Sequence, residues 1–151
     1  MQPNIIFREQ LLIKGLSGRG YETKNVWSAF DDSFNSAPFE KGSGDGYEIR
    51  FFDGDSSVDT ENDVHVGFLT ESTQNDGVFS TLALPATEYA VFYVIVANGY
   101  DSENANMSKW LEDNSKQFRQ RQLNGNNYIV ECYNARFQNG VVEIWIPLER
   151  K

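Results

Sequence analysis

The segment YIVECY, residues 128–133, places one carboxylate inside an apolar strand pattern. Side chains alternate between the two faces of a strand, so Ile129, Glu131 and Tyr133 are expected on one face. A carboxylate among apolar side chains is costly unless another group compensates its charge. Glu131 therefore faces water, pairs with Arg50 of the same chain, or meets a positively charged ligand. We take it as the first candidate binding residue.

Other residue patterns give weaker indications of a functional site. Glu143 either faces Glu131 across the last hairpin, where two close carboxylates would raise one pKa, or is a solvated strand residue. The segment that begins at Asp53, DGDSSVDTEND, lacks the glycine and the final glutamate of an EF-hand loop, which favours a solvated acidic loop. His65 is the only histidine, and Cys132 is expected to be a small buried side chain. We expect no catalytic residue, no metal and no cofactor.

Hydrophobic periodicity divides the chain into strands and two helices. The strands are expected at 4–16, 47–52, 63–70, 77–84 (a short one), 88–96, 128–133 and 141–148. The first helix has one face formed by Val26, Trp27, Phe30 and Phe34, with Thr23 as a candidate N-cap. The second helix is expected around 105–119, with Met107, Trp110, Leu111 and Phe118 on one side.

The order strand, helix, strand, strand occurs twice, in half-repeats of about 4–70 and 77–149. YEIRFF in the first half matches YIVECY in the second, so that Arg50 takes the place of Glu131. We expect one α+β domain over residues 1–151, built as a pseudo-twofold duplication of a β-α-β-β half. Its antiparallel sheet would carry the helices on one side and a ligand cleft between the halves, because such junctions commonly bind ligands.

The two faces of the sheet are expected to differ. The helices would cover the face that carries Tyr47, Ile49, Phe51, Tyr128, Val130 and Cys132. The open side would then present Phe52, Glu131, Tyr133 and Trp145. Aromatic rings attract cations by about 0.5–2 kcal/mol each, and a carboxylate adds a directional contact. This set favours a hydrophobic cation as ligand, and the alternative is that the aromatic residues only build the core.

Composition limits the classes of partner. The net charge of the 151 residues is −9, and only Lys116, Arg119 and Arg121 approach a basic cluster, which argues against direct nucleic acid binding. No apolar run reaches the length of a membrane span, and the N-terminus shows no signal peptide pattern. A single cysteine suits a reducing compartment, so a cytoplasmic location is expected.

The order of motifs resembles a known family. LPATEYAVFYV (84–94), KWLEDNSKQF (109–118), YIVECY and VVEIWIPL (141–148) follow the pattern of the effector-binding domain of AraC- and MerR-type regulators, also called the GyrI-like family. The pattern maps to Leu84–Ala86 with Tyr89, to Trp110, to Glu131 and Tyr133, and to Ile144–Pro147. The first half fits more loosely through LLIKGLSGRG and VWSAF.

This resemblance implies a pseudo-symmetric fold and, by analogy with multidrug-sensing members, a strand glutamate that contacts cationic drugs. That role would fall to Glu131, with Tyr133 and Trp145 as walls and Trp27, Phe52, Phe68, Tyr93 and Trp110 as further contributors. Within these 151 residues we expect no helix-turn-helix domain, and the chain resembles stand-alone members, including those of integron gene cassettes. Two alternatives stay open: a hydrolase of reactive small molecules with Glu131 as general base, or a module that binds a protein such as gyrase or a transcription regulator.

Overall fold

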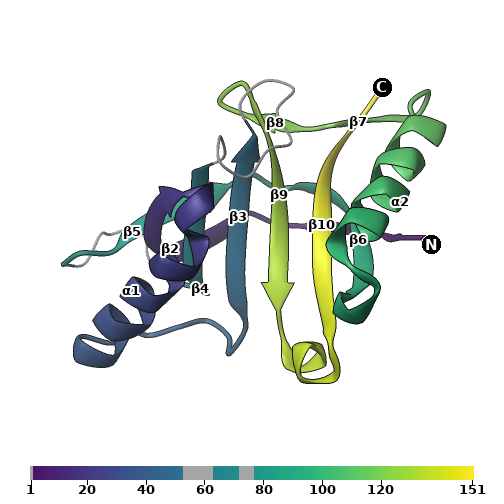
Figure 1. The fold of residues 1–151 in the computed structure, drawn as a ribbon. Helices are drawn as coiled ribbons and strands as arrows, with labels where there is room; N and C mark the ends of the chain where they lie inside the picture. The colour runs from purple at the N-terminus through teal and green to yellow at the C-terminus, as the bar shows by residue number, and fades with distance from the viewer. Residues whose placement is uncertain (1, 53–62, 72–76) are drawn as a thin grey trace.

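The computed structural model describes residues 2–52, 63–71 and 77–151, so the acidic segment at 53–62 lies outside the described residues. The described residues form ten strands and two α-helices (Figure 1). In chain order these are β1 (Asn4–Arg8), β2 (Leu11–Arg19), α1 (Thr23–Ser36), β3 (Gly46–Phe52), β4 (Asp63–Leu69), β5 (Ser80–Leu84), β6 (Thr87–Ile95), α2 (Tyr100–Asp113), β7 (Phe118–Gln120), β8 (Gln122–Leu123), β9 (Asn126–Tyr133) and β10 (Val141–Arg150). No helix among the described residues is long and apolar enough to cross a membrane.

All strands belong to one antiparallel sheet in the order β1-β6-β10-β9-β3-β4-β2-β5, with β7 beside β10 and β8 beside β9. This order is symmetric about the β3·β9 pair, since β3-β4-β2 on one side corresponds to β9-β10-β6 on the other. Each outer strand pairs with the opposite half, β1 with β6 and β5 with β2. The mixed α+β fold with a large antiparallel sheet agrees with the prediction.

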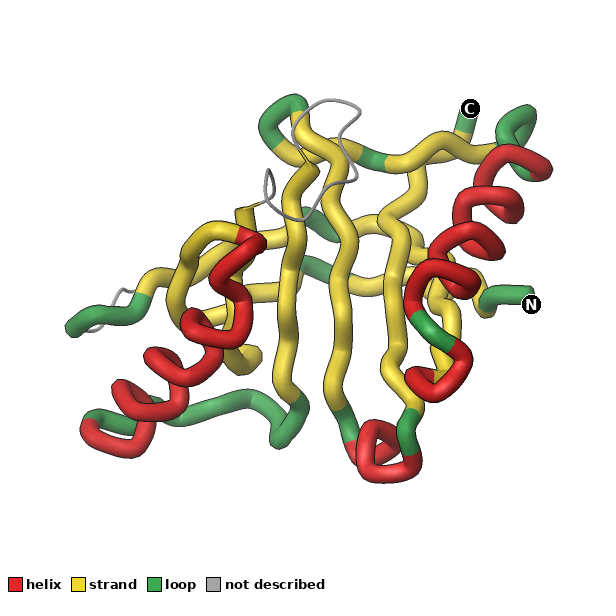
Figure 2. The backbone as a smooth tube through the Cα atoms, viewed as in Figure 1, coloured by secondary structure: helices red, strands yellow, loops and turns green. Residues whose placement is uncertain are grey.

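The sheet curls so that one of its faces closes on itself (Figure 2). Gly15 and Gly67, which pair between β2 and β4, allow a close approach there, because a Cβ on Gly15 would lie 1.6 Å from the carbonyl oxygen of Val66. The enclosed face forms one apolar cluster that contains Ile13, Tyr47, Ile49, Leu84, Tyr89, Val91, Tyr128, Val130, Cys132 and Trp145. Cys132 is a buried member of this cluster, as expected.

Both helices lie on the other face of the sheet, one beside each half (Figures 1 and 2). Helix α1 packs Val26 and Phe30 against Val64 and Val66 of β4. Helix α2 packs Met107 and Trp110 into a cluster with Phe92, Val94, Ile144 and Ile146 from β6 and β10. The prediction that the helices cover the face of Tyr47 and Val130 is therefore wrong: that face is covered by the sheet itself.

Most predicted elements are confirmed, with shifted boundaries. The predicted strand 4–16 is two strands, β1 and β2, and the short strands β7 and β8 were missed. Helix α2 begins earlier than expected and ends at Asp113, so Phe118 lies in β7. Thr23 is the first residue of α1 rather than its N-cap, and its hydroxyl donates a hydrogen bond to the carbonyl of Gly20 (2.6 Å).

Candidate functional site

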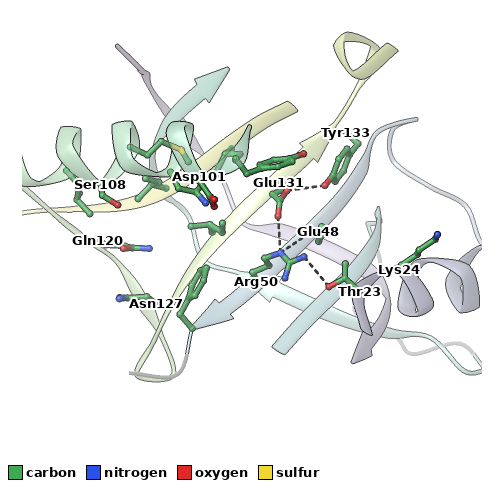
Figure 3. A pocket seen from close by; sticks show the side chains of 18 residues that line it. Thr23, Lys24, Glu48, Arg50, Asp101, Ser108, Gln120, Asn127, Glu131 and Tyr133 are labelled. Carbon is green, nitrogen blue, oxygen red and sulfur yellow. Dashed lines mark hydrogen bonds and ion pairs between the residues drawn. The ribbon is translucent and has the colours of Figure 1, made fainter. Parts of the chain in front are cut away.

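A cleft of about 900 Å³ opens between α1 and α2 on the face that carries the helices (Figure 3). Its floor is formed by the central strands β3, β9 and β10, which the helices flank without covering. Its volume falls within the range of small-molecule sites. The lining residues are Thr23, Lys24, Glu48, Arg50, Phe52, Tyr100, Asp101, Asn104, Met107, Ser108, Leu111, Gln120, Asn127, Ile129, Glu131, Tyr133, Ile144 and Ile146.

Two carboxylates meet at the centre of the floor. Glu48 of β3 and Glu131 of β9 are directly opposite each other in the antiparallel ladder, so both side chains lie on the same face of the sheet. They are 3% and 7% exposed, respectively. Two ionised carboxylates at such a position repel each other and lose hydration, so the site needs positive charge or a proton.

Arg50 supplies one positive charge to both carboxylates (Figure 3). Its Nε donates to Glu48 Oε2 at 2.9 Å and to Glu131 Oε2 at 3.1 Å, and its Nη2 donates to Thr23 Oγ1 at 3.1 Å. The Tyr133 hydroxyl donates to Glu131 Oε1 at 3.0 Å. Trp27 Nε1 donates to Glu48 Oε1 at 2.8 Å. The two acids, the guanidinium and two aromatic donors thus form one network across β3, β9 and α1.

This environment changes the acidity of Glu131. Burial and, after it, the neighbouring Glu48 raise its pKa to about 8, while the charge of Arg50 and the hydrogen bond from Tyr133 oppose the rise. Burial and the nearby Glu131 also raise the pKa of Tyr133 and of Tyr100, so both phenols stay protonated at neutral pH. At pH 7 Glu131 is mostly protonated, and the network is close to neutral.

The remainder of the cleft is apolar at its base and polar at its rim. Ile129, Ile144 and Ile146 extend the floor, and Met107 and Leu111 of α2 form one wall. The rim carries charged, hydroxyl and amide groups, namely Lys24, Asp101, Asn104, Ser108, Gln120 and Asn127. Such a site accommodates a molecule with an apolar body and one charged or hydrogen-bonding centre.

The family follows from comparison with known proteins. The model of the GyrI-like small molecule binding domain matches residues 1–149. The chain belongs to the GyrI-like family. This domain is a small-molecule binding domain, in agreement with the resemblance in its motifs. No curated protein sequence matches the chain.

Solved structures share the fold of this GyrI-like domain at low sequence identity. The C-terminal domain of EcmrR matches with a TM-score of 0.73 and 10% identity over 99% of this chain and 98% of that one. SAV2435, solved bound to tetraphenylphosphonium, matches with a TM-score of 0.63 and 10% identity over 99% and 94%. A hydrolase from Listeria innocua matches with a TM-score of 0.58 and 11% identity over 98% and 92%.

Four of the eight predicted ligand-binding residues lie in or against the cleft of the GyrI-like domain. Glu131, Tyr133 and Phe52 line it. Trp27 lies behind it, where its ring contacts the Tyr133 ring edge-on with centroids 6.1 Å apart. Alternation along β9 correctly placed Glu131 and Tyr133 on one face.

The other four lie elsewhere. Trp145 was expected on the open face but is in the enclosed cluster, because Ile144, not Trp145, is the partner of Glu131 in the ladder. Trp110 packs against Phe92 and Phe118 beneath α2, and Phe68 packs with Phe30 beneath α1. Tyr93 lies under the guanidinium of Arg136, 4.9 Å from its ring centroid.

Both expectations for Glu143 are corrected. Glu143 neither faces Glu131 nor lies in solvent: it is 6% exposed on the opposite face, where it accepts hydrogen bonds from Arg136 Nη1 (2.8 Å), Trp145 Nε1 (3.0 Å) and the Asn134 amide. The pairing of Glu131 with Arg50, one of the alternatives considered from the sequence, is confirmed, and the residue opposite Glu131 in the ladder is a second acid, Glu48. Glu48 was missed, although an acid between Tyr47 and Ile49 follows the same alternation rule that identified Glu131.

Proposed function

We propose that this domain reversibly binds hydrophobic cations in the cleft, with Glu131 as the counter-charge and with Tyr133 and Phe52 as aromatic walls. One observation carries the proposal: within the described residues, two buried carboxylates share the single guanidinium of Arg50. When both acids are ionised, one negative charge is left over. A ligand cation compensates that charge in a water-poor site, where the attraction is stronger than in bulk solvent.

The shape of the cleft supports the same class of ligand. The apolar base formed by Ile129, Ile144 and Ile146, together with Met107 on the wall, removes the body of a lipophilic ion from water. The Tyr133 ring adds attraction for a cation that lies over its face. SAV2435, which has the same fold, was solved with the bulky cation tetraphenylphosphonium. That ion is therefore the natural first probe.

The test compares a charged and a neutral ligand of similar shape. Tetraphenylphosphonium and neutral triphenylphosphine oxide are titrated by isothermal calorimetry into the wild-type protein and into Glu131→Gln. We expect the substitution to weaken phosphonium binding by about tenfold, the size of one charge-assisted contact, and to leave the neutral ligand nearly unchanged.

Glu143→Gln is the matched control for this experiment. Glu143 is also a buried acid, on β10, but it lies on the opposite face of the sheet. We expect wild-type affinity for the phosphonium in this variant. Equal weakening of both ligands by Glu131→Gln, with the fold intact, would refute the electrostatic role of Glu131. Failure of the wild type to bind any lipophilic cation would refute the proposed function.

A second candidate function is hydrolysis of a reactive small molecule, with Glu131 as general base. The favouring observation is that Glu131 has a pKa of about 8, contacts the Tyr133 hydroxyl and lines an open cleft. A base with a pKa near the working pH is effective in proton transfer. The Listeria innocua protein of the same fold bears the name hydrolase. Turnover of an electrophile that Glu131→Gln abolishes would favour this function over simple binding.

A further inference from the structure

We propose that Arg50 is an internal competitor for the ligand cation, displaced from Glu131 when the ligand binds, and that it thereby sets the cation affinity of the cleft. This inference rests on the proposed function. It concerns a residue that lines the same cleft as Glu131 but carries the same sign of charge as the ligand.

The contacts of Arg50 show what a ligand would have to replace. Its Nε is shared between Glu48 Oε2 at 2.9 Å and Glu131 Oε2 at 3.1 Å, so the longer of the two bonds goes to the proposed ligand-binding carboxylate. Charge-assisted hydrogen bonds of this kind are among the strong ones. When Glu131 is ionised, a cation that approaches it therefore competes with an ion pair that is already formed.

Within the described residues, Arg50 can give up Glu131 and keep its contacts to Glu48 and Thr23. Glu48 keeps one contact to Nε, and Thr23 Oγ1 on α1 accepts from Nη2. The side chain of Arg50 is 16% exposed, more than those of Glu48 (4%) and Glu131 (9%), so it is the most accessible member of the trio. A rotation of the guanidinium toward Glu48 and Thr23 would uncover Glu131 Oε2. Tyr133 still holds the other oxygen.

The charge balance of the site leads to a counter-intuitive expectation. Removing a residue from a binding cleft normally weakens binding, but removing a competing cation strengthens the attraction for another cation. At pH 9 and above, where Glu131 is mostly ionised, we therefore expect Arg50→Gln to bind tetraphenylphosphonium about tenfold more tightly than the wild type, which corresponds to the loss of one close charge pair. Substitution of a residue that only supports the shape of the cleft would instead weaken binding of the phosphonium.

Lys24→Gln is the matched control. Lys24 lines the same cleft and is exposed, and no contact of Lys24 with Glu48 or Glu131 is found in the described part of the chain. Its removal lowers the positive charge of the cleft without removing the competitor. We expect a change of less than about twofold, since exposed charges are well screened. An equal gain in Lys24→Gln and Arg50→Gln would show a general charge effect and would overturn the role given to Arg50.

The site of competition is tested in a double-mutant cycle. In a Glu131→Gln background the gain from Arg50→Gln should disappear, because the competitor and the ligand no longer contend for a carboxylate. If wild-type protein binds the phosphonium and Arg50→Gln binds it equally or less tightly, the inference is overturned while the proposed function stands. If neither protein binds the phosphonium, the proposed function fails as well.

A measurement on the wild type keeps the inference testable if Arg50→Gln does not fold. The Nε–H signal of Arg50 is assigned in a nitrogen-edited NMR spectrum by its absence in Arg50→Lys. Saturation with tetraphenylphosphonium should shift this signal and speed its exchange with solvent. A signal that stays unchanged at saturation would show that Arg50 remains on Glu131, and would overturn the inference.

Discussion

The pH dependence of ligand binding offers a direct test of the charge arrangement in the cleft. The perturbation is a change of pH from 6 to 9 at constant ionic strength. Burial and the adjacent Glu48 raise the pKa of Glu131 to about 8. A cation requires the ionised form, so binding must expel the proton. Affinity for tetraphenylphosphonium should therefore increase as the pH rises.

The size of the effect follows from the ionised fraction of Glu131. With a pKa of about 8, roughly one molecule in a hundred is ionised at pH 6, about one in ten at pH 7 and about half at pH 8. The apparent Kd should thus fall about tenfold from pH 6 to pH 7 and about fivefold from pH 7 to pH 8. Above pH 9 it should level off.

Other groups that face Glu131 leave this profile intact over the same range. Arg50 stays charged, and burial holds the pKa of Tyr133 and of Tyr100 above their usual values. Calorimetry in buffers of different ionisation enthalpy measures the proton directly: nearly one should be released per ligand at pH 7, and almost none in Glu131→Gln. A flat profile in the wild type, tighter binding at low pH, or the same profile in Glu131→Gln would refute the reasoning.

Three further predictions concern the cleft and its support. Trp27 contacts Tyr133, whereas Trp145 lies in the enclosed cluster. The Trp27→Phe variant should therefore lose most of the tryptophan fluorescence response to the phosphonium, and the Trp145→Phe variant should keep it. A response retained in Trp27→Phe and lost in Trp145→Phe would contradict this placement. Phe30 is fully buried among four phenylalanines, so Phe30→Ala should lower the unfolding free energy in urea by about 3–5 kcal/mol; a loss below about 1 kcal/mol would indicate that the cluster is not closely packed. Because folded Glu131 retains a proton that the unfolded chain releases, wild-type stability should fall as the pH rises from 4.5 to about 8; Glu131→Gln should flatten this part of the profile, and an unchanged slope would argue against a raised pKa.

Local sequence patterns were sufficient to predict most secondary-structure elements and some of the residues that line the cleft. Alternation along a strand depends only on backbone geometry, so Glu131 and Tyr133 could be placed together from residues 128–133 alone. The spacing of Val26, Phe30 and Phe34 likewise identified the apolar face of α1 without knowledge of its partner. The repeated order of elements and the motif resemblance indicated the family, which the match over residues 1–149 confirms.

The choice of sheet face required the tertiary structure. In β3 and β9, both faces carry apolar residues, so either can be buried, and nothing in a strand pattern says whether a helix or another part of the sheet covers it. Here the curl of the sheet encloses Tyr47 and Val130, and the helices flank the face of Glu48 and Glu131.

The register between strands decided which residues of the neighbouring strands lie beside Glu131. Trp145 and Glu131 lie on different strands, and a shift of one residue in their pairing moves Trp145 to the other face. The structure pairs Glu131 with Ile144 in β10 and with Glu48 in β3, which excludes Trp145 and adds a second acid. The amino-acid sequence alone therefore determined that a strand carries a carboxylate beside a tyrosine, since that is a local property. Only the tertiary structure determined that a second carboxylate and Arg50 meet it, because contacts between residues 81 positions apart depend on how the strands pair.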